Sequence, residues 1–132
     1  MQERFTLFSI GYLKKHEEEY SIIEILSKYE MACDGLREGM YIIVLCWFHM
    51  CDDKENRSLL MVHPMGDTKQ PLKGVFATRS NSRPNPIGHY TVKIHKIEGN
   101  KIYIEKIDAY EGTPIIDIKP FLRQLDCPLS ES

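Results

Sequence analysis

Residues 90–105 carry the clearest local pattern in the chain. Every second residue from Tyr90 to Ile94 is bulky and apolar, and the alternation returns at Ile102 and Ile104. The tripeptide Glu98-Gly99-Asn100 separates the two runs and has the composition of a turn. Because successive side chains of a strand point to opposite faces, one face of this pair is apolar. The pattern predicts an antiparallel hairpin with one buried face.

Strand patterns also dominate the rest of the chain. The run at residues 40–49 is continuous, β-branched and aromatic, as in a strand buried on both sides. Further strands are predicted at residues 5–12, 21–26, 58–62, 74–77 and 115–121, a short helix near 28–35, and polar loops or turns at 14–20, 52–56 and 63–74. These elements predict a mainly β fold, a small antiparallel β-barrel with one or two short helices that forms a single domain over residues 1–132.

The charge is distributed unevenly. The chain has 17 basic and 19 acidic side chains, a formal net charge of −2, which disfavours a general electrostatic binder of nucleic acid. Residues 73–106 nevertheless carry seven basic side chains against only Glu98 and Glu105. This block predicts a localised surface that faces an anion.

Three observations bear on compartment and metal content. No stretch of about 18 apolar residues exists, and the N-terminus has no signal-peptide pattern. The four cysteines form no C-x-x-C pair, so we interpret them as reduced thiols, and a zinc site built from them with His49 or His63 is disfavoured. The sequence thus predicts a cytoplasmic protein without membrane contact and without a metal.

Two loop segments are unusually rich in groups that bind ligands. Residues 74–88 (GVFATRSNSRPNPIG) hold two arginines, and Pro84 and Pro86 restrict the backbone there. Residues 108–120 (DAYEGTPIIDIKP) add carboxylates and a phenol. Each loop alone is consistent with an ordinary turn, with Arg79 paired to an aspartate. Together they fit a polar small molecule or a nucleotide, and neither offers an obvious covalent nucleophile.

Both segments resemble the signature segments of the TsaA-like (TrmO-type) family of S-adenosylmethionine-dependent tRNA methyltransferases. CWFH at 46–49 and VHPMGD at 62–67 are similar as well. The resemblance covers about residues 5–123. It implies a compact β-barrel that works as a homodimer, with S-adenosyl-L-methionine bound near the subunit interface. It also implies methylation of N6 of threonylcarbamoyl-adenosine at position 37, in the tRNA anticodon loop. The additional C-terminal domain of longer bacterial members is expected to be absent.

The chemistry of the implied reaction suggests catalytic, stacking and RNA-contact residues of this chain, and the resemblance itself assigns its cofactor contacts. Candidate catalytic residues are Asp108 and Tyr110, either of which would accept the N6 proton. Tyr110 and Phe48 are candidates to stack on the target base. Candidate contacts to RNA are Arg83, Asn85 and Lys119. The candidate cofactor-binding residues are His49, Met50, Arg79, His89, Asp108, Ala109, Tyr110 and Glu111.

The chain departs from the family pattern at several positions. KKHEEEY at 14–20 stands where family members usually carry Pro-Arg-Gln, and His89, Glu111 and Met65 replace other usual residues. These departures leave a second hypothesis open. The chain would then bind S-adenosylmethionine or another small ligand without methylating tRNA, or would methylate a small molecule.

Overall fold

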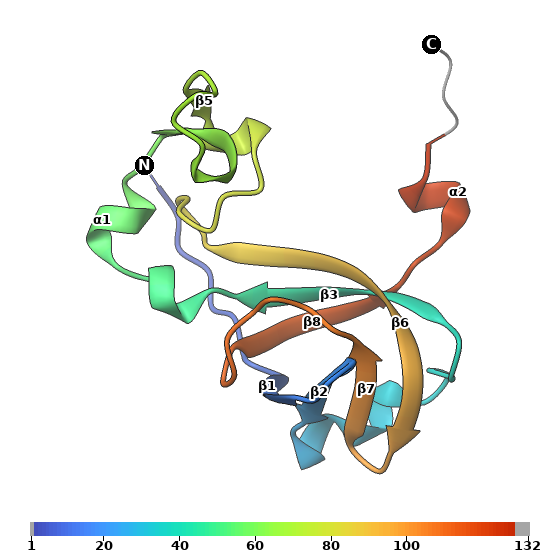
Figure 1. Cartoon of the computed structure of the whole chain (residues 1–132). Helices are drawn as coiled ribbons and strands as arrows, with labels where there is room; N and C mark the ends of the chain where they lie inside the picture. Colours follow the sequence, from blue (N-terminus) through green and yellow to red (C-terminus); the bar gives the residue numbers. More distant parts are fainter. Residues whose placement is uncertain (1, 129–132) are drawn as a thin grey trace.

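Six antiparallel strands form a closed barrel in the computed structural model, which describes residues 2–128 (Figure 1). Around the barrel the strands follow the order β1-β2-β7-β6-β3-β8. Their bounds are Gly11–His16 (β1), Tyr20–Ile25 (β2), Tyr41–Trp47 (β3), Ile87–Glu98 (β6), Lys101–Glu105 (β7) and Pro114–Pro120 (β8). The predicted mainly β barrel is therefore confirmed.

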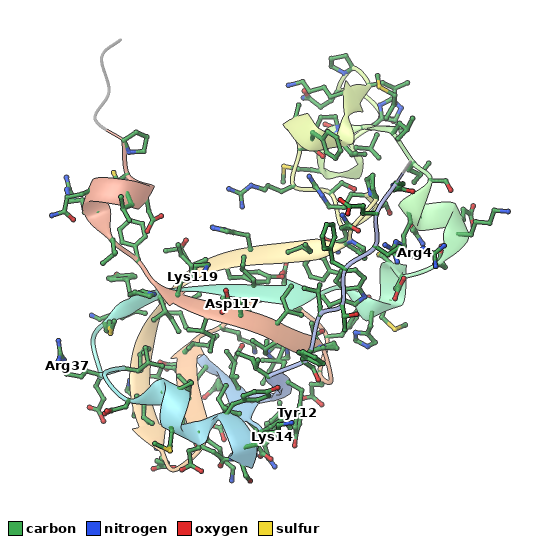
Figure 2. All side chains as sticks on the ribbon, turned by 180° about the vertical axis from the view of Figure 1, so that it is seen from behind. Arg4, Tyr12, Lys14, Arg37, Asp117 and Lys119 are labelled. Carbon is green, nitrogen blue, oxygen red and sulfur yellow. The ribbon has the colours of Figure 1, made fainter. Side chains whose placement is uncertain are left out.

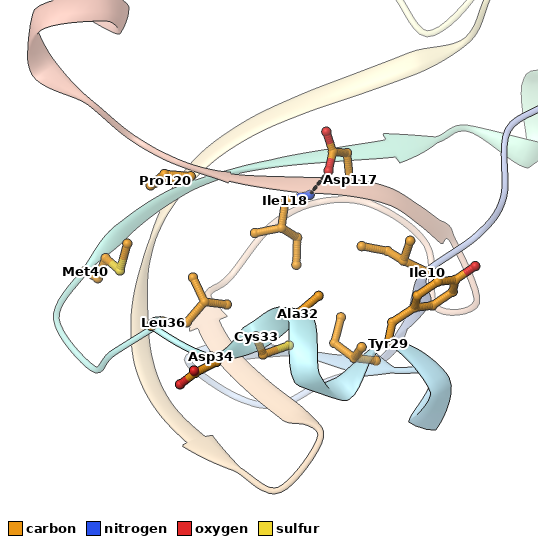
Figure 3. A pocket seen from close by; sticks show the side chains of 12 residues that line it. Ile10, Tyr29, Ala32, Cys33, Asp34, Leu36, Met40, Asp117, Ile118 and Pro120 are labelled. Atoms are coloured by element: carbon orange, nitrogen blue, oxygen red, sulfur yellow. Dashed lines mark hydrogen bonds between the residues drawn. The ribbon is translucent and has the colours of Figure 1, made fainter.

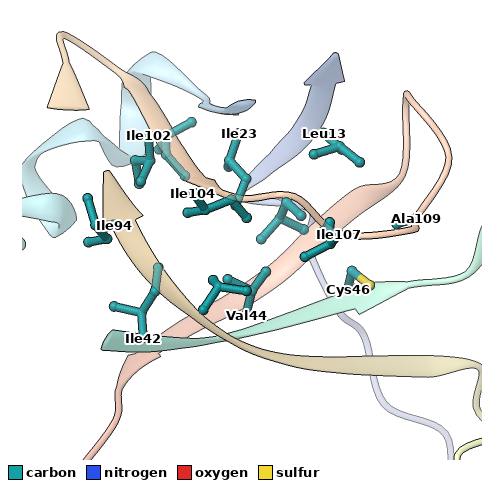
Figure 4. Packing of buried hydrophobic residues seen from close by; sticks show 13 residues of the cluster. Leu13, Ile23, Ile42, Val44, Cys46, Ile94, Ile102, Ile104, Ile107 and Ala109 are labelled. Carbon is teal, nitrogen blue, oxygen red and sulfur yellow. The ribbon is translucent and has the colours of Figure 1, made fainter. Parts of the chain in front are cut away.

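The interior of the barrel is filled by branched aliphatic side chains (Figure 4). The alternation along β6 and β7 places one face of each strand in this core, as in Val92, Ile94, Ile102 and Ile104. Burial of this kind is the main favourable contribution to folding. Other fully buried members are Leu13, Ile23, Ile42, Val44, Cys46 and Ile115.

The predicted hairpin is confirmed. Strands β6 and β7 pair with Glu98 opposite Lys101, and the intervening Gly99 has a φ of +62°, which suits glycine in a tight turn. The register shifts between Ile94 and Lys96. His95 lies at this irregularity, and its ring stacks on that of Tyr20 with the centroids 4.0 Å apart.

The N-terminal prediction is wrong in part. No strand covers residues 5–10, and β1 begins at Gly11 and continues through Lys14 and Lys15, which were predicted as loop. Gly11 packs so closely on β2 that an added Cβ would lie 3.0 Å from the Cα of Ile25. Residues 2–10 precede β1 as an extended segment outside the barrel, here called the N-terminal arm. Its Phe5, Leu7 and Phe8 are exposed.

A small lobe connects β3 to β6 and lies beside the barrel (Figure 1). It contains η2 (His49–Cys51), α1 (Lys54–Arg57), β4 (Met61–Val62), η3 (Pro64–Gly66), β5 (Lys73–Gly74) and η4 (Val75–Ala77). The turn predicted at 52–56 is largely helix α1, because the carboxylate of Asp53 caps the backbone N–H of Asn56 at 2.7 Å. The strand predicted at 58–62 is shorter and is limited to β4. The strand predicted at 74–77 is wrong, because only Gly74 belongs to β5 and residues 75–77 form the 3-10 helix η4.

The remaining helices are short. The 3-10 helix η1 (Ser27–Cys33) matches the helix predicted near 28–35, and α2 (Arg123–Asp126) follows β8. An apolar cavity of about 390 Å³ lies between η1 and β8, lined among others by Tyr29, Leu36 and Ile118 (Figure 3). Over residues 2–128, every helix is too short or too polar to cross a lipid bilayer.

Candidate functional site

A second cavity, of about 570 Å³, opens where the lobe meets the barrel. We call it the polar cleft. Its walls come from the end of β3, from η4, from the loop at 78–86, from the start of β6 and from Asp108. The lining residues are Phe48, Phe76, Arg79, Asn81, Arg83, Pro84, Asn85, Ile87, Gly88, His89, Tyr90 and Asp108. Both of the ligand-rich segments identified in the sequence therefore contribute to one cavity.

The loop at 78–86 is held from within by Arg83. The Nη1 of Arg83 donates to the backbone carbonyls of Thr78 at 3.0 Å and Ser80 at 2.9 Å. Ser80 in turn accepts the backbone N–H of Ser82 on its hydroxyl. The guanidinium of Arg83 is thus used to shape the loop, a role that the sequence did not predict for it.

Arg57 of α1 holds the same loop from outside. Its Nε donates to the carbonyl of Pro84 at 2.7 Å, and its Nη2 donates to Oδ1 of Asn85 at 3.1 Å. Asp52 accepts from both Arg57 and the indole N–H of Trp47. Both hydrogen bonds lower the pKa of Asp52, and the bond from Trp47 has the larger effect. The network fixes the proline-rich loop before any ligand binds.

Arg79 and His89 form the nitrogen-rich side of the polar cleft. The Nη1 of Arg79 lies 3.4 Å from Nδ1 of His89, a long and weak contact. Arg79 forms no ion pair with Asp108 or Asp117 among the described residues, so the structure does not support the purely structural pairing. The other N–H groups of this guanidinium remain available to an anionic ligand.

Tyr90 and Asp108 form a second polar group in the cleft. The hydroxyl of Tyr90 donates to Oδ1 of Asp108 at 2.7 Å. Burial raises the pKa of Tyr90 well above its usual value of 10, and the hydrogen bond to Asp108 adds to this effect. The phenol therefore stays protonated and acts as a permanent donor that orients the carboxylate. The second oxygen of Asp108 can accept a hydrogen bond from a ligand.

Aromatic rings complete the walls. Phe48 lies edge-on to Tyr90, with ring centroids 6.5 Å apart. Gly88 makes room for the Phe48 ring, because a Cβ there would lie 2.6 Å from Cε2 of Phe48 and 2.7 Å from Sγ of Cys46. The ring of Phe76 is largely exposed at the cleft. The polar cleft thus combines a guanidinium, an imidazole and a carboxylate with apolar ring faces.

Six of the predicted site residues line the polar cleft: Phe48, Arg79, Arg83, Asn85, His89 and Asp108. The others do not line it. His49 and Met50 are exposed on η2, and Ala109 is buried with its carbonyl accepting from His16. Tyr110 and Glu111 are exposed beyond Asp108. Lys119 is on β8, where its Nζ pairs with Asp117 at 3.1 Å (Figure 2).

Tyr90, Phe76 and Arg57 are site residues that the sequence reasoning missed. Tyr90 carried a usable signal, because it shares the apolar face of its strand with Val92 and Ile94, and a tyrosine hydroxyl on such a face needs a partner. No comparable signal marked Phe76 or Arg57. Among the described residues, no three His, Cys, Asp or Glu side chains lie close enough to hold a metal ion.

Comparisons with known proteins agree with this architecture. A family model described as the tRNA-methyltransferase O N-terminal domain matches residues 13–127. A probable S-adenosyl-L-methionine-binding protein of Methanocaldococcus jannaschii is 59% identical over 124 residues, which cover 94% of this chain and 98% of that protein. A similar protein of Pyrococcus horikoshii, also described as a probable S-adenosyl-L-methionine-binding protein, is 52% identical over 126 residues.

Two more distant relatives are described by an activity or by the name of an enzyme. A tRNA (adenine(37)-N6)-methyltransferase of Mus musculus is 34% identical over 104 residues, which are 79% of this chain and 23% of that protein. The crystal structure of TrmO from Pseudomonas aeruginosa matches with a TM-score of 0.72 and 26% identity, over 98% of this chain and 61% of that one. This chain therefore spans about three fifths of the solved protein and about a quarter of the mouse protein.

Proposed function

The chain belongs to the tRNA-methyltransferase O N-terminal domain family, and from this membership we propose that it is an S-adenosyl-L-methionine-dependent methyltransferase that acts on tRNA. Its substrate would be N6 of threonylcarbamoyl-adenosine at position 37. The observation that carries the proposal is the meeting of Arg79, His89 and Asp108 in one cleft. Arg79 and Asp108 come from the two segments that resemble the family's signatures, and His89 directly follows the first of them.

The groups of the polar cleft fit the cofactor chemically. S-adenosyl-L-methionine has a carboxylate, an ammonium, ribose hydroxyls, an adenine ring and a cationic sulfonium. Arg79 suits the carboxylate, and Asp108 suits the ribose hydroxyls or the ammonium. The rings of Phe48 and Phe76 offer flat faces for the adenine or the sulfonium. A cleft of about 570 Å³ lies within the usual range for small-molecule sites.

When bound, the cofactor supplies an electrophilic methyl group. The chain's own contribution is to hold the two reactants and to accept a proton. Asp108 is the better candidate to take the proton of an attacking N6 amine, because Tyr90 fixes one of its oxygens and leaves the other available. Tyr110 is 70% exposed beyond Asp108, so its ring is accessible for stacking on a base that leaves the anticodon loop.

Binding and transfer are tested separately. Isothermal titration of the protein with S-adenosyl-L-methionine should show saturable binding, and Asp108→Asn should weaken it. Incubation with cofactor and tRNA bearing threonylcarbamoyl-adenosine should yield N6-methylated nucleoside in mass spectrometry of the digested tRNA. Absence of binding would refute the whole proposal, whereas binding without this product would refute only the tRNA reaction.

A homodimer is part of the proposal, and the N-terminal arm supports it. Phe5 and Phe8 are 83% and 68% exposed, and Leu7 is 55% exposed. Such a run of apolar side chains on an ordered segment is typical of a surface that a partner covers. Analytical ultracentrifugation should show a dimer for the unaltered chain and a monomer for the double variant Phe5→Ser, Phe8→Ser. A monomeric unaltered chain would contradict this part.

One observation favours the alternative of binding without tRNA methylation. All three candidate RNA contacts already have partners: Arg83 within its loop, Asn85 with Arg57, and Lys119 with Asp117. Each would have to exchange a contact within the protein for one to RNA. In that case the protein would bind the cofactor with full affinity, while added tRNA would remain unmodified and would not compete for the protein.

A further inference from the structure

A buried serine and a histidine lie behind the segment that carries Asp108. Ser21 of β2 is fully buried, and its hydroxyl oxygen accepts the backbone N–H of Ile107 at 3.0 Å. The same hydroxyl lies 2.8 Å from Nδ1 of His16, the last residue of β1. The Nε2 of His16 lies 2.7 Å from the carbonyl oxygen of Ala109. One side-chain pair thus holds backbone groups on both sides of Asp108.

For an imidazole with one ring hydrogen, these contacts fix the direction of each hydrogen bond. A carbonyl oxygen only accepts, so the Nε2 of His16 carries the hydrogen that bonds Ala109. Nδ1 is then free to accept, and the hydroxyl of Ser21 donates to it. The oxygen of Ser21 meanwhile accepts from Ile107. In this arrangement the hydroxyl of Ser21 both donates and accepts, and both ring nitrogens of His16 are hydrogen-bonded.

The tether determines where Asp108 points. Ile107 and Ala109 are 7% and 5% exposed, so the side chains on either side of Asp108 are directed into the barrel. In extended chain the intervening side chain points the opposite way. Asp108 is accordingly exposed and meets the hydroxyl of Tyr90 in the polar cleft.

The end of β1 braces the following residues as well. The backbone N–H of His16 donates to Oε2 of Glu111 at 3.3 Å. The backbone N–H of Gly112 donates to the carbonyl of Leu13 at 2.7 Å. His16 belongs to the KKHEEEY stretch, in which the chain departs from the family pattern, and Glu111 is another departure. The two departures are therefore in contact with each other.

We propose that His16 is a positioning residue that, together with Ser21, sets the orientation of Asp108 for ligand binding in the polar cleft. The inference rests on the proposed function, because it takes S-adenosyl-L-methionine as the ligand. His16 itself does not line the cleft, so its effect passes through the backbone of Ile107 and Ala109.

Titration calorimetry on three variants tests the proposal. His16→Ala removes the tether and should raise the Kd for S-adenosyl-L-methionine about fivefold to tenfold, the effect of one or two lost hydrogen bonds. His16→Gln keeps an N–H donor at the end of the side chain and should stay within about twofold of the unaltered protein. The matched control is His95→Ala, because His95 stacks on Tyr20 outside this network, and it should bind normally.

A second readout separates positioning from a purely structural role and from failure of the proposed function. A histidine that only stabilised the barrel would lower the Tm of His16→Ala and leave its Kd unchanged, which would overturn the inference. If the unaltered protein binds no cofactor, the proposed function fails. Amide hydrogen exchange then decides the inference: faster exchange at Ile107 and Gly112 in His16→Ala supports the tether, and unchanged exchange overturns it.

Discussion

The hydroxyl of Tyr90 donates a 2.7 Å hydrogen bond to Oδ1 of Asp108. The two residues come from different elements, β6 and the segment that follows β7, and both line the polar cleft. Because the pKa of Tyr90 is raised by burial and by this carboxylate, the phenol donates throughout the physiological pH range. Asp108 is consequently presented to a ligand with one oxygen fixed.

Tyr90→Phe removes this donor while keeping the ring. We expect the Kd for S-adenosyl-L-methionine to rise about threefold to tenfold, because the net value of one hydrogen bond to a charged group is about 1 kcal/mol or more. Tyr103→Phe is the matched control, since Tyr103 lies on β7 outside the cleft, under Lys96. Calorimetry measures both, and equal affinities of the two variants would refute an orienting role for Tyr90.

Arg79→Ala should weaken cofactor binding without unfolding the protein. Within residues 2–128 the guanidinium forms one long contact, to His89 at 3.4 Å, so its removal leaves few groups unsatisfied. At an exposed position we expect a loss of affinity of about threefold to tenfold. Arg37→Ala is the control, because Arg37 is exposed at the other end of the molecule (Figure 2). A lower Tm for Arg79→Ala, with normal affinity, would instead assign Arg79 a structural role.

Gly88→Ala should destabilise the fold and narrow the polar cleft. The added methyl group would lie 2.7 Å from Sγ of Cys46 and would overlap the Phe48 ring, and overpacking of this kind costs about 1–3 kcal/mol. Gly74→Ala is a matched control, because a Cβ added at Gly74 would lie 3.9 Å from the carbonyl oxygen of Leu60, an ordinary contact distance. Urea denaturation should show a lower midpoint for Gly88→Ala only, and equal midpoints would contradict this packing.

The barrel could be predicted largely because apolar and polar side chains alternate along several of its strands. Strands β6 and β7 follow the apolar period of two, and β3 follows its continuous apolar run. The strand predicted at 5–12 failed because apolar alternation alone does not supply a partner strand. Strand β1 begins at Gly11 because this small residue allows close packing on β2 and because Leu13 after it is buried.

The candidate site could be predicted only in outline. Arg79 and Asp108 come from loop segments whose composition is unusual, and this made them candidates. His89 lies on β6 and became a candidate only through the family resemblance. Arg57 contacts Pro84 and Asn85 across 27 and 28 residues, and such pairings leave no local pattern. The same holds for His16, which bonds Ala109 across 93 residues and lies in a stretch that was predicted as a charged loop.

Cys46 should be the least reactive thiol of the folded protein. It is fully buried in the barrel, and burial raises its pKa to about 11, so only about one thiol in a thousand is ionised at pH 8. Cys127 is exposed. Iodoacetamide at pH 8, followed by mass spectrometry of peptides, should label Cys127 within minutes and Cys46 only after denaturation with urea.

Burial of Cys46 should also make the stability of the fold depend on alkaline pH. Because the unfolded thiol ionises near pH 9, the stabilising effect of burying it neutral is lost progressively as the pH rises from 9 towards 11. Cys46→Ala should flatten this alkaline loss of stability, measured as the urea midpoint against pH. Labelling of Cys46 as fast as Cys127 in the folded protein would show that the barrel opens there.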